Sequence, residues 1–157
     1  MSRGRHCVTG EQLIDRCDDG RDAVRMTMIS PMLAVGDGKA AIAFYEAAFG
    51  ARVRWMIDAG GHVIAGLEID GAEFFLATES PPKTRGPAAV GFTTVRIELF
   101  VDDPVAVHAR AIAAGATPRS AVERHEHTTT DAKQFRMLQG SVTDPSGHVW
   151  LLGKFLE

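Results

Sequence analysis

Apolar and polar residues follow a repeating order from Ile29 onward. An apolar run ending at Gly36 predicts a strand, and residues 39–50 then place apolar side chains at helical spacing. Three segments with strand character follow, and the last two are separated by Asp70-Gly71. Because an Asp-Gly pair between alternating segments is a strong signal of a β-hairpin, the order of elements is predicted to be β-α-β-β-β.

The same order is predicted a second time. After a Pro- and Gly-rich segment, a strand, a helix starting at Asp103-Pro104 and further strands follow. Val35 corresponds to Val101 at an offset of 66 residues, and Gly50 corresponds to Gly115 at an offset of 65. The predicted fold class is therefore α+β, with two βαβββ repeats forming curved mixed sheets around a shared cleft and the helices outside.

The domain boundaries follow from these patterns. Residues 26–157 are predicted to form a single domain, with repeat one at 29–80, a linker at 81–92 and repeat two at 93–155. Residues 1–25 carry many charges and few large apolar side chains, so we expect a disordered N-terminal extension.

Composition narrows the classes of function. The net charge of −3 disfavours a general nucleic-acid-binding surface, which needs clustered cations. No apolar run approaches the roughly 20 residues that span a bilayer, so no membrane association is expected. The two cysteines, Cys7 and Cys17, do not indicate a disulfide scaffold or a zinc site. We expect reduced thiols in a cytoplasmic protein.

Three strings carry a family resemblance: AFYEAAFGA at 43–51, RAIAAGA at 110–116 and DPSGHVWLL at 144–152. Together they resemble the PhnB-like branch of the vicinal oxygen chelate superfamily, the glyoxalase and bleomycin-resistance fold. The resemblance runs from about Ile29 to Phe155. It implies a homodimer, and it leaves function open, since the superfamily includes metal-dependent lyases, isomerases and dioxygenases as well as metal-free drug-binding proteins.

The resemblance also indicates where the metal enzymes of the superfamily place their ligands. Those positions fall here on Ser30, on Phe75 or Ala77, on Arg96 and on Leu151. None is His, Asp or Glu, the residues that hold metals of this class. We therefore expect no metal and no cofactor at these positions.

Strand alternation predicts which side chains line the cleft. The expected ligand-binding set, facing away from the helices, is Ser30, Met32, Phe75, Arg96, Glu98, Phe100 and Leu151. An arginine in a mostly apolar cleft suits an anionic group on a small, partly apolar ligand. Arg96 and Glu98 alternatively form a mutual ion pair.

Three functions remain open, and no catalytic residue is assigned. The first is a metal-free small-molecule-binding protein. The second is an enzyme, either with relocated metal ligands such as Glu73 and Glu98 or with acid-base chemistry by Arg96, Glu98 or His62. The third is an interaction module.

The remaining histidines receive structural interpretations. If residues 125–127 were extended, the side chains of His125 and His127 would lie on the same face, a spacing that can bind a metal ion. The polar segment 124–133 is instead interpreted as a surface loop or lid. His108 is expected on the solvated side of the second helix. His148 is expected to fix the turn before the last strand, and Trp150 to pack beneath the second helix.

Overall fold

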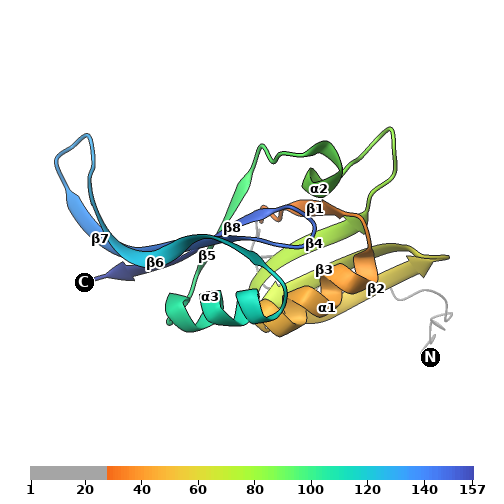
Figure 1. Ribbon diagram of the computed structural model, residues 1–157, viewed down its shortest axis with the longest axis horizontal. Helices are drawn as coiled ribbons and strands as arrows, with labels where there is room; N and C mark the ends of the chain where they lie inside the picture. The colour runs from red at the N-terminus through yellow and green to blue at the C-terminus, as the bar shows by residue number, and fades with distance from the viewer. Residues whose placement is uncertain (1–27) are drawn as a thin grey trace, which may run out of the picture.

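Each half of the chain folds into a four-stranded sheet with a helix on one face (Figure 1). This computed structural model describes residues 28–157, so the expected N-terminal extension lies outside the described residues. The first half contains β1 (Met32–Val35), α1 (Gly38–Phe49), β2 (Arg52–Ala59), β3 (His62–Ile69) and β4 (Ala72–Thr78). The second contains β5 (Arg96–Phe100), α3 (Pro104–Ala113), β6 (Thr117–Thr128), β7 (Gln134–Thr143) and β8 (Val149–Leu156).

The strand orders of the two sheets are equivalent. The first sheet runs β1-β4-β3-β2 and the second β5-β8-β7-β6. In each sheet the first strand pairs in parallel with the last strand of its repeat, and the other pairs are antiparallel. The predicted α+β class with two βαβββ repeats is confirmed.

The helices begin and end where the sequence signals predict. Asp37 accepts a hydrogen bond from the Ala40 amide at 3.0 Å, which caps α1, and Gly50 ends the helix with a positive φ of 70°. Asp103 caps α3 in the same way through the Ala106 amide at 3.0 Å. These matching caps fix the helices at equivalent points of the repeats.

Two segments differ from the prediction. The linker contains a short helix, α2 (Pro87–Val90). Residues 124–128 belong to strand β6 rather than to a loop, and only 129–133 form the turn to β7. The reason is cross-strand pairing, which gives the polar positions His125 and His127 the apolar partners Met137 and Phe135. The hairpin formed by residues 123–139, here called the arm, extends away from helices α1 and α3 (Figure 1).

The helix-covered sides of the two sheets form one core. The ring centroid of Trp150 in β8 lies 4.7 Å from that of Phe49 and 5.5 Å from that of Tyr45, so Trp150 packs against α1. The sequence had predicted packing beneath the helix of repeat two instead. The buried Asp144 carboxylate accepts hydrogen bonds from Tyr45 Oη at 2.7 Å and Trp150 Nε1 at 2.9 Å. Burial and the nearby Asp144 carboxylate raise the pKa of Tyr45. This network joins the two repeats.

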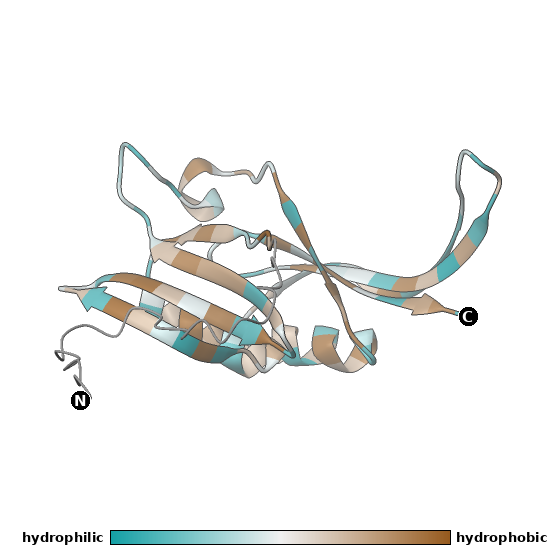
Figure 2. Cartoon of the chain, turned by 180° about the vertical axis from the view of Figure 1, so that it is seen from behind, coloured by the Kyte–Doolittle hydropathy of each residue, from teal (hydrophilic) through white to brown (hydrophobic). Residues whose placement is uncertain are grey.

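The helix-free faces of both sheets lie open on the same side of the molecule, the side seen in Figure 2. Met32 on the first sheet is 59% exposed and Phe155 on the second is 59% exposed. Within residues 28–157, the chain thus presents the two walls of the expected cleft side by side and does not close them over each other. None of the helices described is long and apolar enough to cross a membrane.

Candidate functional site

The helix-free face of the first sheet carries an apolar row across all four strands. Strand register aligns Met32 of β1 with Phe75 of β4, Phe75 with Gly66 of β3, and Gly66 with Trp55 of β2. Alternation had predicted Met32 and Phe75 on this face, and the structure brings them together as neighbours. The row also includes Trp55, which the sequence analysis missed.

Trp55 lies flat over Gly66. A Cβ added to Gly66 would stand 2.4 Å from Trp55 Nε1 and 2.6 Å from Cε2, so only glycine leaves room for the indole. The indole also lies 5.6 Å from the Phe75 ring and remains 43% exposed. A glycine inside a predicted strand is the sequence signal that could have suggested such a close approach. The result is an exposed aromatic surface packed closely on the sheet.

The equivalent row of the second sheet is more polar. Glu98 aligns with Leu151, Leu151 with Ser141, and Ser141 with Ser120. The Ser120 and Ser141 hydroxyls are 2.8 Å apart and share a hydrogen bond. The structure therefore places the expected residues Glu98 and Leu151 beside each other, and it adds two hydroxyl groups that the sequence analysis did not select.

Arg96 and Phe100 lie on the same face as Glu98, as alternation predicts, and all three are exposed. Arg96 and Glu98 do not form the ion pair that was the alternative expectation, because no hydrogen bond or salt bridge joins these two residues in the described part of the chain. Glu98 instead accepts a hydrogen bond of 3.4 Å from Gln139 Nε2. No other described residue forms a hydrogen bond or salt bridge with the exposed Arg96 side chain, so its guanidinium is available to an external acceptor.

A cavity of about 440 Å³ lies where the edges of the two sheets approach each other. It is lined by Met32 of β1, Ile97 of β5 and Phe92 of the linker, among others. The His148 ring closes the junction, with Nε2 2.9 Å from the Ala34 carbonyl oxygen. Met32, a residue of the expected set, therefore lies at the boundary between the two sheets.

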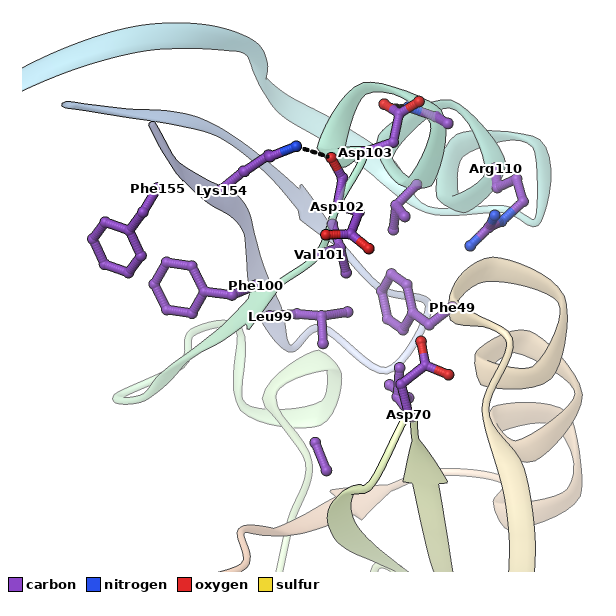
Figure 3. A pocket seen from close by; sticks show the side chains of 14 residues that line it. Phe49, Asp70, Leu99, Phe100, Val101, Asp102, Asp103, Arg110, Lys154 and Phe155 are labelled. Carbon is purple, nitrogen blue, oxygen red and sulfur yellow. Dashed lines mark hydrogen bonds between the residues drawn. The ribbon is translucent and has the colours of Figure 1, made fainter. Parts of the chain in front are cut away.

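A second cavity, of about 650 Å³, lies between the repeats near the end of β5 (Figure 3). Its floor is apolar and includes Phe49 and Leu99, while Asp70 and Asp102 stand at its rim. Lys154 Nζ donates to the Asp102 carbonyl oxygen at 2.9 Å. Of the expected ligand-binding residues only Phe100 lines this cavity, so it is distinct from the two helix-free rows.

Comparison with known proteins decides the family. The sequence model of the Glyoxalase/Bleomycin resistance protein/Dioxygenase superfamily matches residues 26–152. The chain belongs to this superfamily. An uncharacterized protein of Mycobacterium bovis is 36% identical over 132 residues, which cover 80% of this chain and 82% of that protein.

Solved structures of other proteins share the fold. TioX from Micromonospora sp. ML1 aligns with a TM-score of 0.57 at 23% identity, over 83% of this chain and 98% of that one. A mutant of the fosfomycin resistance protein FosX from Listeria monocytogenes, complexed with Mn(II) and a dihydroxypropylphosphonic acid, aligns with a TM-score of 0.52 at 16% identity. That alignment covers 80% of this chain and 87% of FosX. Such identities show the fold alone.

The positions that would hold a superfamily metal do not suit one in this chain. Strand register shows that Phe75, rather than Ala77, is the counterpart of Leu151. Phe75 aligns with Met32 of β1, and Leu151 aligns with Glu98, the equivalent residue of β5. Phe75 and Leu151 have no donor atom, and a guanidinium such as that of Arg96 repels a cation. In residues 28–157, no group of three or more His, Cys, Asp or Glu side chains is placed to hold a metal ion.

Ser30 is the remaining position of that set. Its hydroxyl oxygen is shielded from solvent and has no hydrogen-bond partner among the described residues. A single neutral hydroxyl does not make a metal site, but a buried hydroxyl without a partner costs free energy that a ligand could recover.

The other polar candidates lie apart from the rows. Glu73 and His62 are half-buried at the ends of their strands. His108 Nε2 lies 3.0 Å from the Ser120 carbonyl oxygen, so His108 contacts the sheet rather than only solvent. The His148 amide donates to the Asp144 carboxylate at 2.9 Å, which confirms its role in the turn.

Proposed function

We propose that the chain is a metal-free small-molecule-binding protein of the glyoxalase and bleomycin-resistance type. The observation that carries the proposal is the set of residues at the superfamily's metal positions: Ser30, Phe75, Arg96 and Leu151. Two of these side chains are apolar, one is cationic and one is a neutral hydroxyl, a combination that suits an organic ligand and not a cation.

The ligand proposed is partly apolar and carries an anionic group. The row of Met32, Phe75 and Trp55 offers an apolar surface on which a flat ring can stack. The exposed Arg96 guanidinium offers paired donors for a carboxylate, phosphate or sulfonate. The unpaired Ser30 hydroxyl offers one further hydrogen bond.

The proposal includes a homodimer. Each chain has one apolar and one polar wall open on the same side, and burying both against a second copy would remove exposed apolar area from water. In such a dimer the first sheet of one copy would face the second sheet of the other. The cytoplasmic location and the PhnB-like branch belong to the same proposal and rest on the cysteine content and on the three sequence strings.

The test combines metal analysis with ligand binding on the purified full-length protein. Chelator treatment should leave ligand binding unchanged, because none of the four superfamily positions is expected to hold a metal. Anilinonaphthalene sulfonate, an anionic aromatic probe, should raise Tm and quench Trp55, the exposed one of the two tryptophans. Loss of probe binding on removal of a metal would overturn the metal-free proposal, whereas an ion bound outside the four superfamily positions would not.

A further inference from the structure

The outer part of β6 carries two histidines on one face. His125 and His127 occupy alternate positions of the strand and align with Met137 and Phe135 of β7. Their ring centroids lie 6.2 Å apart, and their ring planes differ by 20°. The two imidazoles therefore stand parallel on the same side of the arm, as side chains two residues apart on a strand should.

Apolar neighbours lie beside both rings, and the ring nitrogens have no hydrogen-bond partner among the described residues. The His127 ring stacks on Phe135 at 4.9 Å, and His125 is the cross-strand partner of Met137, which is 5% exposed. No hydrogen bond to either imidazole is found within residues 28–157. The neighbouring ion pair of Arg124 and Glu126, at 3.2 Å, involves the alternate positions and points to the opposite face.

This arrangement meets the requirements of a two-histidine metal clip. A Zn²⁺ ion binds imidazole nitrogens at about 2.0–2.1 Å, so the two nitrogens must come within about 4 Å of each other. Since each ring nitrogen lies off its centroid, rings 6.2 Å apart reach that separation by side-chain rotation, without movement of the strand. Glu123, two positions earlier on the same face, adds a negative charge that favours a cation.

We propose that His125 and His127 bind one divalent transition-metal ion of the zinc, copper and nickel group, the ions that imidazole ligands favour. Water would complete the coordination. This site uses none of the four superfamily positions, and it lies on the helix-free face of the second sheet, farther out than the row that contains Glu98 and Ser120. It lies in the arm, which extends beyond the point where the equivalent hairpin of repeat one turns at Gly60 and Gly61. It requires neither the ligand cleft nor a dimer.

Calorimetric titration of chelator-treated full-length protein with Zn²⁺ tests the proposal. We expect saturable binding of one ion per chain. The variants His125→Gln and His127→Gln should each weaken binding by about tenfold or more, because each removes half of the protein's donors. Glu123→Gln should weaken it by a smaller factor. The matched control His108→Gln, whose imidazole already contacts the Ser120 carbonyl oxygen, should bind Zn²⁺ as the parent protein does.

A companion measurement locates the ion. Substoichiometric Ni²⁺ should broaden the amide NMR signals of the arm and leave those of α1 unchanged, and circular dichroism should show that each variant is folded. Absence of saturable Zn²⁺ binding would overturn the proposal. Undiminished binding by the double variant His125→Gln/His127→Gln would also overturn it, because the ion would then lie elsewhere in the chain.

Discussion

The helix-free faces of the two sheets occupy matched positions in the repeats and carry different side chains. Met32 and Trp55 of the first sheet correspond to Glu98 and Ser120 of the second. On the opposite faces both sheets bury aliphatic and aromatic side chains in one core. The core thus constrains one face of each sheet, while the side chains of the other face are free to differ and to bind a ligand.

The largest effect should come from breaking the core that the repeats share. Asp144→Ala removes the acceptor for the Tyr45 and Trp150 side chains and for the His148 amide, and it leaves these three buried donors unpaired. We therefore expect a loss of about 3 kcal/mol or more in the free energy of unfolding. The exposed cap variant Asp103→Ala should lose only about 1 kcal/mol. Urea denaturation measures both, and equal losses would show that Asp144 does not link the repeats.

The second prediction concerns the charged face. Arg96→Met keeps much of the apolar stem and removes the charge, so binding of anilinonaphthalene sulfonate should weaken by about 1.5–3 kcal/mol. Neutral N-phenylnaphthylamine should lose little. Fluorescence titration compares the two probes. An equal loss for both, or unfolding of the variant without ligand, would assign Arg96 a structural role.

The third prediction concerns the apolar face. Trp55→Leu should weaken both aromatic probes alike, by about 1–2 kcal/mol, because stacking does not depend on the charge of the ligand. Gly66→Ala should reproduce the effect, since its Cβ would displace the indole. The control Ser120→Ala, at the matched position of the second sheet, should bind the neutral probe normally. Unchanged binding in Trp55→Leu would remove this row from the site.

The smallest effect is expected from the N-terminal segment. Deletion of residues 1–25 should change the free energy of unfolding by less than about 1 kcal/mol, because the segment has few apolar side chains to bury. Probe binding should also persist, which would show that both faces are complete without it. A larger loss in denaturation experiments would mean that this segment packs on the domain.

Sequence reasoning predicted the faces of β1, β4 and β5 because a covering helix demands apolar residues at every second position. It could not place Trp55, since a bulge between Val53 and Trp55 shifts the register of β2 and breaks simple alternation. The strand character of residues 124–128 depends on pairing with β7, a non-local contact that polar composition conceals. Alternation also assigns a side chain to one face of a sheet, but it does not show whether that face contacts solvent, a ligand or a second chain.

The most direct test of the proposed site is complementation between two defective chains. Trp55→Asp disables the apolar wall and Arg96→Glu the polar wall, and neither homodimer should bind anilinonaphthalene sulfonate. After subunit exchange, half of the dimers are mixed, and each has one cleft with two intact walls, so about a quarter of the sites should recover. Recovery of that size is the predicted result. A monomeric mass by light scattering, or no recovery after exchange, would contradict a site built from two copies.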